Sequence, residues 1–252
     1  MIRRSRLAVA LVLTLALGVT AIAYADGTSQ NDAFVDGQVS KKNKPKLSKK
    51  KFKKVDFNTG VRTTADSQAP GHPIPAEELI HFSKNIKFKT SKAPVCTTVP
   101  GPGSTPQEAR DACPAKSYLG SGTAEVKAPG TPPADFADDV TVTTFAGPGN
   151  NQIQLHTHSP TLGLLAPTVQ GFIVKSDAGK KFKQALSVPE APVTPGGTMI
   201  TQFDSDIMKK TGTVLARCKP KKFTWMREVT YSDGTTDTAK TTQKCKPKKK
   251  KK

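Results

Sequence analysis

The stretch FTWMREVTYSDGTTDTAKTTQ, residues 223–243, decides the fold class of this chain. Its first part alternates, and the apolar residues that share one face are Phe223, Trp225, Val229 and Tyr231. Arg227 interrupts that face. This period of two is typical of a strand buried on one side. Asp233-Gly234 then favours a tight turn, and the Thr-rich residues 235–243 return as the second strand of a hairpin.

Similar short stretches continue outward from the hairpin through residues 55–245, which are long enough for one domain with a core. Turn residues separate the alternating segments, which lie at Ile80–Phe88, Val140–Val142, Ile153–Leu155, Val169–Val174 and Phe182. The pattern predicts an all-β fold, an antiparallel two-sheet β-sandwich of jelly-roll or immunoglobulin-like type. A closed barrel is the alternative.

One short helix is predicted at residues 106–112. Thr105 is a suitable N-cap, Pro106 suits the first helical position, and Glu108 places an acidic group in the first turn.

The first 25 residues have the three parts of a cleavable secretory signal. Arg3, Arg4 and Arg6 precede the apolar stretch Leu7–Ala23, and Ala23-Tyr24-Ala25 is a small-residue cleavage site. An uncleaved anchor is the alternative, but the apolar stretch is shorter than the roughly 20 residues that span a bilayer. We therefore expect a secreted protein that begins at Asp26 and has no transmembrane helix in its mature form.

Four cysteines allow three disulfide pairings in an exported chain. Sequence-local pairing of Cys96 with Cys113 and of Cys218 with Cys245 is favoured, because a short loop and a hairpin each bring their own ends together. Each such bridge would contribute about 3 kcal/mol. Neither pair has the C-x₂₋₄-C spacing of a structural zinc site.

The positive charge is concentrated outside residues 55–245. The whole chain carries +19, whereas residues 55–245 hold 21 basic and 17 acidic side chains, a net of +4. The expected organisation is a disordered Lys-rich linker at 26–54, the sandwich at 55–245 and a Lys-rich tail at 246–252. Fifteen lysines of the two runs are the predicted polyanion-binding residues: Lys41, Lys42, Lys44, Lys46, Lys49, Lys50, Lys51, Lys53, Lys54, Lys246, Lys248, Lys249, Lys250, Lys251 and Lys252.

The expected partners of these lysines are anionic cell-envelope polymers or lipid headgroups. A lysine near an anionic surface contributes on the order of 1 kcal/mol. Specific nucleic-acid binding is not expected, because the runs lack arginine and contain only Phe52 as an aromatic residue that could stack on a base.

Several short strings together resemble a group of exported β-rich proteins of actinobacteria that has no assigned activity. The strings are Pro75–Phe82, Ile86–Phe88, the Cys96–Cys113 loop, Ser121–Ala124, Leu155–Thr157 and the Cys218–Cys245 hairpin. The resemblance implies a secreted single domain and supplies no catalytic residue.

His156 and His158 are the best metal candidates, because positions i and i+2 on a strand project to the same face. His72 and His81 are the only other histidines, and a solvated histidine pair is the simpler interpretation. An exported hydrolase or metal-dependent enzyme that uses His156 and His158 is the alternative function.

Other chemical signatures are incomplete. Asp204 and Asp206 resemble the opening of a calcium loop, but Met208 stands where a third oxygen ligand is needed. Asp135, Asp138 and Asp139 form a second weak calcium candidate. Glu77 and Glu78 are adjacent and so would face opposite ways on a strand. Ser121 lacks the first glycine of a nucleophile elbow, and Gly179-Lys180 lacks the rest of a phosphate loop. We expect a non-enzymatic binding or structural protein of the envelope that needs no cofactor.

Overall fold

The computed structural model describes residues 33–40, 44–63, 75–90, 93–101, 103–127, 136–163, 168–189, 199–231 and 234–248. All of them belong to the second of two units, 31–252, and none to the first, 1–30. The predicted signal peptide, Lys41, Lys42 and Lys249–Lys252 lie outside the described residues. Among the described residues, no helix is long and apolar enough to span a bilayer.

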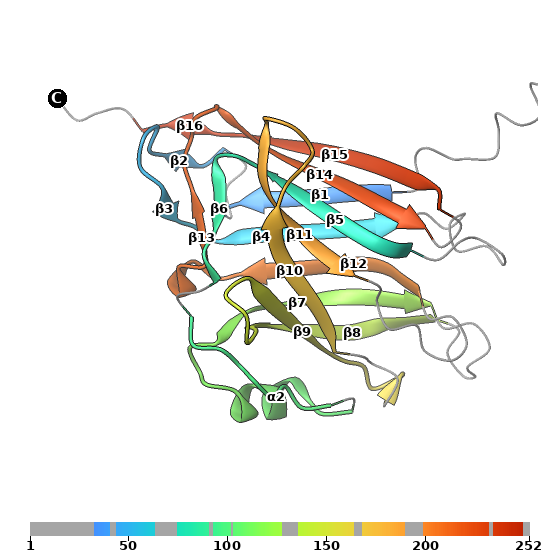
Figure 1. Ribbon diagram of the computed structural model, residues 1–252. Coiled ribbons are helices and arrows are strands. Elements are labelled where there is room, and N and C mark those ends of the chain that lie inside the picture. The colour runs from blue at the N-terminus through green and yellow to red at the C-terminus, as the bar shows by residue number, and fades with distance from the viewer. Residues whose placement is uncertain are drawn as a thin grey trace, which may run out of the picture. The chain divides into compact units, whose positions relative to one another are not determined.

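Eleven strands form one large sheet in which every neighbouring pair is antiparallel (Figure 1). In spatial order they are β1 (Ala33–Val39), β4 (Phe57–Thr63), β12 (Met199–Ile207), β7 (Tyr118–Lys127), β8 (Phe136–Ala146), β9 (Gln152–His158), β10 (Val169–Lys175), β11 (Phe182–Pro189), β5 (Pro75–Ser83), β14 (Lys222–Tyr231) and β15 (Thr236–Lys244). A three-stranded sheet joins β3 (Lys53–Lys54), β13 (Val214–Ala216) and β6 (Ile86–Phe88), and a two-stranded sheet joins β2 (Lys46–Leu47) to β16 (Lys246–Pro247).

The large sheet curls until its two outermost strands meet. The backbone N–H of Ala33 in β1 donates to the Asp237 carboxylate of β15 at 3.1 Å, and the N–H of Val39 donates to Oε1 of Gln243 at 2.9 Å. The expected all-β antiparallel character is confirmed. The two-sheet sandwich is not confirmed, because the ladder hydrogen bonds run without a break through eleven strands. The architecture is closer to the barrel alternative.

Aromatic rings from four strands fill the centre of the core. Phe57 of β4 lies edge-on to Phe82 of β5 and Phe88 of β6, with ring centroids 5.5 and 5.2 Å away. Trp225 of β14 lies 6.2 Å from Phe57 and has no exposed surface. Gly37 of β1 packs against the same indole, because a Cβ at Gly37 would stand 2.2 Å from Cε2 of Trp225. The N-terminal strand therefore depends on glycine for its fit.

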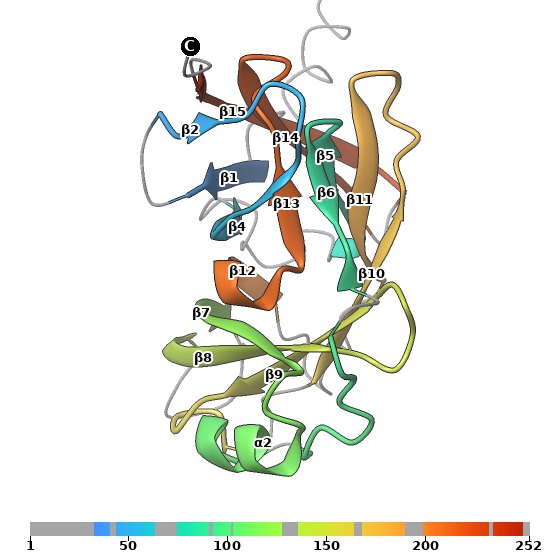
Figure 2. The same ribbon diagram turned by 90° about the vertical axis from the view of Figure 1, so that its left-hand side faces the viewer.

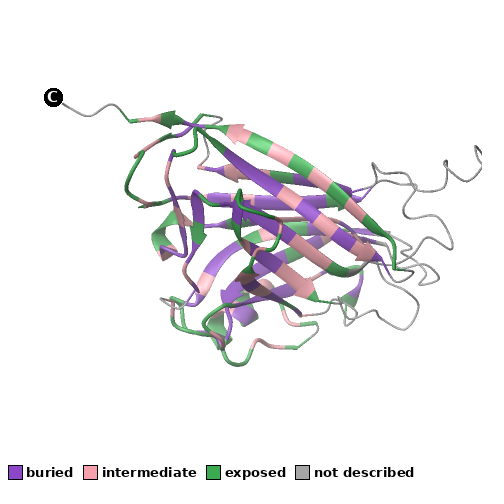
Figure 3. Cartoon of the chain, turned by 45° about the horizontal axis from the view of Figure 1, so that its top comes forward, coloured by how far each residue is buried: buried purple, intermediate pink, exposed green. Residues whose placement is uncertain are grey.

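The predicted hairpin is present as β14 and β15, which pair in register from Lys222–Lys244 to Thr230–Thr236. Figure 3 shows β14 largely buried while β15 alternates between half-buried and exposed residues. Arg227 is nevertheless buried on the inner face. Its Nε and Nη2 donate to the two carboxylate oxygens of Glu78, both at 3.1 Å, and its Nη1 donates to the carbonyl of Arg62.

Both predicted disulfides are present, with Cα–Cα distances of 5.1 Å for Cys96–Cys113 and 5.9 Å for Cys218–Cys245. The predicted helix is also confirmed as α2 (Pro106–Ala112). Its N-terminus has a capping box, in which the Glu108 N–H donates to the Thr105 hydroxyl and the Thr105 N–H donates to the Glu108 carboxylate.

The structure corrects the expected disorder of residues 33–40 and 44–54, the described part of the linker, and the expected start of the domain at residue 55. Residues 33–39 form β1, and the lysine run contributes β2 and β3. Ala33, Val35 and Val39 point into the core at alternate positions, which a composition average over the segment conceals. Lys246 and Pro247, expected in a disordered tail, form β16.

Candidate polyanion-binding surface

The two lysine runs, which are about 200 residues apart in the sequence, meet in the structure. β2 and β16 pair in parallel, so that Lys46 lies opposite Lys246 and Leu47 opposite Pro247. The N–H of Lys246 donates to the carbonyl of Pro45 at 3.0 Å, and the N–H of Lys248 donates to that of Leu47 at 2.9 Å. Figure 1 shows β2, β3 and β16 together at one end of the sheet. The described parts of the two predicted polyanion-binding segments therefore lie side by side.

Local contacts hold the first lysine run in shape. The Ser48 hydroxyl accepts hydrogen bonds from the N–H groups of Lys50 and Lys51, at 3.2 and 3.0 Å. The Ser48 carbonyl accepts one from the N–H of Cys218 at 2.8 Å. The guanidinium of Arg217 lies 4.7 Å from the centroid of the Phe52 ring, a cation–π contact. Phe52 thus anchors the run to the fold.

The small sheet β3–β13–β6 continues the surface, and Figure 2 shows β6 and β13 on the side that faces the viewer. Lys54 of β3 and Lys87 of β6 lie in register on either side of Leu215 of β13. Side chains in register on neighbouring strands share a face, so the half-buried Leu215 lies between two exposed lysines.

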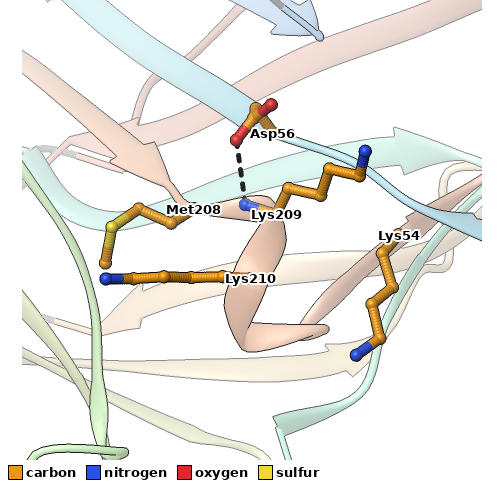
Figure 4. Close-up of a pocket in the computed structure, with 5 residues that line it drawn as sticks. All are labelled: Lys54, Asp56, Met208, Lys209 and Lys210. Atoms are coloured by element: carbon orange, nitrogen blue, oxygen red, sulfur yellow. Dashed lines mark hydrogen bonds between the residues drawn. The ribbon is translucent and has the colours of Figure 1, made fainter.

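An open pocket of about 570 Å³ lies next to β3 and is lined by Lys54, Asp56, Met208, Lys209 and Lys210 (Figure 4). Lys209 begins the short 3₁₀ helix η4 (Lys209–Thr211), and its N–H donates to the Asp56 carboxylate at 2.9 Å. The three lysine side chains fan out in different directions. They therefore extend the positive surface rather than enclose one small anion.

We name the resulting surface the basic face. Segments 44–55, 209–222 and 244–248 contain 15 lysines and Arg217 but no acidic residue. All 15 lysines are exposed: Lys44, Lys46, Lys49, Lys50, Lys51, Lys53, Lys54, Lys209, Lys210, Lys219, Lys221, Lys222, Lys244, Lys246 and Lys248. Nine of them were predicted from the two runs. The other six were not predicted: Lys209, Lys210, Lys219, Lys221, Lys222 and Lys244. The absence of acidic residues from 209–222 is a sequence signal that points to the first five of them.

The histidine candidates have a different environment from the one expected. His156 is buried rather than solvated, and its Nε2 lies 2.8 Å from the hydroxyl of Ser104. The same hydroxyl donates to the carbonyl of Gly101 at 2.8 Å. Burial, with a smaller contribution from His158, holds the pKa of His156 below its usual value.

Within the described ranges, no three His, Cys, Asp or Glu side chains lie close enough together to hold a metal ion. His81 is buried as well. Its Nδ1 lies 2.9 Å from the Ser176 hydroxyl and its Nε2 lies 3.4 Å from the Glu228 carboxylate.

The calcium candidates are used in local hydrogen bonds. Asp204 and Asp206 both accept from the amide of Asn58, at 2.7 and 3.2 Å, and burial raises the pKa of Asp204. Asp139 accepts from the side chains of Ser159 and Thr161. Asp135 lies outside the described residues.

Glu77, Glu78 and the two incomplete motifs, at Ser121 and at Gly179, lie in strands or in a turn. Glu78 is the ion-pair partner of Arg227, a role that the sequence analysis did not foresee, while Glu77 is exposed. Ser121 is an exposed residue of β7, and Gly179 occupies the turn between β10 and β11 with a φ of 87°.

Comparison with known proteins gives little further information. The sequence matches no protein-family model and no curated protein. Among solved structures, the chain is similar to a cohesin module from a family 33 glycoside hydrolase of Clostridium perfringens, with 6% sequence identity and a TM-score of 0.29 over 86% of this chain and 99% of that one.

Proposed function

We propose that this is a secreted or cell-envelope-associated binding protein, without enzymatic activity, whose basic face associates with anionic envelope polymers or lipid headgroups. The observation that carries the proposal is the pairing of Lys46 with Lys246, which joins two lysine runs from opposite ends of the sequence into one folded surface. Two disulfides suit an oxidising environment outside the cytoplasm, where such anionic polymers are found.

The physical argument is additive attraction to a dense negative charge. Each lysine near an anionic surface contributes on the order of 1 kcal/mol, and the contribution decays within a Debye length of about 8–10 Å. Fifteen exposed lysines therefore suffice for firm, reversible attachment, although Asp56 lies beside Lys54 and Lys209. Because six of these lysines lie in strands and two lie in η4, attachment costs less ordering entropy than it would for two disordered tails.

The test is retention of the mature chain, residues 26–252, by purified cell envelopes. We expect retention at about 0.01 M salt and release near 0.5 M, because screening removes attractions between exposed charges. A variant with Lys49, Lys50 and Lys51 changed to Gln should elute at lower salt. A variant in which the exposed Thr236, Thr238 and Thr242 of β15 become Ser is the neutral control. Absence of retention at low salt, or retention that salt does not change, would refute the proposal.

A further inference from the structure

Lysines occupy alternate positions where β15 continues into β16. In the sequence Lys244-Cys245-Lys246-Pro247-Lys248 the three lysines are exposed, Cys245 is buried and Pro247 is half-buried. Alternate residues of an extended chain share one face, with about 6.6 Å between successive members. Three ammonium groups therefore follow one another in a row on the surface.

The row has a further lysine on each side, because β14 and β2 bond to opposite sides of this segment. Lys222 of β14 lies in register opposite Lys244, and Lys46 of β2 lies in register opposite Lys246. We name these five residues, Lys46, Lys222, Lys244, Lys246 and Lys248, the lysine track. Like charges directly opposite each other on neighbouring strands are destabilising. The segments that hold these lysines, 44–55, 209–222 and 244–248, contain no acidic residue, and a bound anion would relieve the repulsion.

We infer that the lysine track binds a linear polymer of phosphate groups, with one phosphate at each lysine pair. This inference rests on the proposed function. A linear partner fits because the positive groups form a row. Phosphate fits because its tetrahedral oxygens accept from two ammonium groups at once, and lysine binds it as a point charge. Planar carboxylates are better matched by the guanidinium group of arginine, which can donate two parallel hydrogen bonds to them. The one arginine of these segments, Arg217, is engaged with Phe52.

Two triple variants with equal charge loss test the assignment. The first changes Lys244, Lys246 and Lys248 to Gln, and the second changes Lys49, Lys50 and Lys51, which are equally exposed but lie outside the track. The probe is long-chain inorganic polyphosphate at fixed salt. We expect the track variant to lose about tenfold more affinity than the loop variant. Thermal unfolding of both variants shows whether each is folded, and polyphosphate should raise the midpoint of the wild type more than that of the track variant.

Comparison probes separate the sources of negative charge. The wild-type protein should bind poly-L-glutamate and phosphatidylglycerol vesicles more weakly than polyphosphate at equal charge. The two variants should lose equal affinity for these two probes. Equal losses of polyphosphate affinity, or equal binding of polyglutamate, would overturn the inference while leaving the proposed function intact. Preference for vesicles would also overturn it. Failure of wild-type protein to bind any of these probes or the envelopes would instead overturn the proposed function.

Discussion

Gly37 shows how one residue without a side chain permits the sheet to close. A Cβ at this position would lie 2.2 to 2.4 Å from three atoms of the Trp225 indole, which is fully buried and has no room to move aside. We predict that Gly37→Ala lowers the free energy of unfolding by about 1–3 kcal/mol through overpacking. Urea denaturation of the purified variant measures this change.

Gly101 supplies the control for that substitution. No heavy atom lies within 4 Å of a Cβ built there, and the residue is exposed. Gly101→Ala should leave the urea midpoint nearly unchanged. If the free energy of unfolding falls equally in both variants, the loss comes from replacing glycine in general. The contact of Gly37 with Trp225 would then not explain it.

His156 should make stability depend on pH. Burial holds its native pKa below the value near 6.5 of the unfolded chain, so the unfolded state binds more protons as the pH falls through that range. Stability is therefore retained above about pH 6.5 and lost progressively below it. His156→Gln should flatten this dependence between pH 7 and 5, as measured by urea denaturation at each pH. Parallel curves for the variant and wild type would show that His156 does not contribute.

Residue-level roles were predicted only in part. The alternation of residues 223–231 correctly predicts which face is buried, but it marks Arg227 merely as an interruption. Its partners are Glu78 and the carbonyl of Arg62, which lie 149 and 165 residues away in the sequence. A local pattern contains no information about such distant partners, so the burial of this ion pair could not be derived from it.

At the scale of the element, prediction succeeded where the necessary signals lie close together. Thr105, Pro106 and Glu108 specify the start of α2 within four residues, and Asp233-Gly234 lies between the two strands of the hairpin. β1 was missed because its inward positions include Gly37 and its neighbours in sequence are lysines. Ala33 of β1 packs with Val229 and Tyr231 of β14 and with Ala239 of β15, at the other end of the chain.

The Cys218–Cys245 disulfide joins the hairpin to the basic face. The Cys218 N–H donates to the carbonyl of Ser48 within the first lysine run, and Cys245 directly precedes Lys246 of β16. We predict that changing both cysteines to Ala lowers stability by about 2–4 kcal/mol and also weakens polyphosphate binding. Calorimetric unfolding and a binding titration measure the two effects.

The Cys96–Cys113 disulfide is the matched control, because it packs with Ala109 and Phe145 and contributes no residue to the basic face. Its removal should reduce stability by a similar amount but leave polyphosphate affinity unchanged, provided that binding is measured well below the unfolding temperature. Loss of binding in both double variants would mean that stability, rather than the placement of the lysines, controls the surface.

At the scale of the whole molecule, closure of the sheet and formation of the basic face have the same origin. Each depends on residues 33–54 meeting residues 214–248. Strand patterns indicate that the fold is built from short antiparallel strands, but they do not say which strands become the outer edges of the sheet. The two runs contain nine of the fifteen lysines of the basic face, but their composition suggested two independent tails because composition carries no contact information.

The charge distribution predicts how salt affects the whole protein. Without Arg3, Arg4 and Arg6 of the predicted signal peptide, the chain has 36 basic and 20 acidic residues, a net of +16. Repulsion within the basic face opposes folding, whereas the Arg227–Glu78 pair, in which Arg227 is buried and Glu78 half-buried, is less exposed to ions in the solvent. Raising NaCl from about 0.01 to 0.15 M shortens the Debye length from about 30 to 8 Å. We therefore predict a thermal midpoint that rises by about 2–4 °C for each kcal/mol of repulsion removed.

The track variant provides the comparison for this salt effect. Replacing Lys244, Lys246 and Lys248 with Gln removes both cross-strand lysine pairs, so its thermal midpoint should start higher at low salt and rise less than that of the wild type. The Lys49, Lys50 and Lys51 variant removes equal charge but neither pair, and its response should lie closer to wild type. A wild-type midpoint that stays constant or falls with added NaCl would mean that favourable ion pairs outweigh the repulsion, and the clustering of like charge would then impose no cost on the fold.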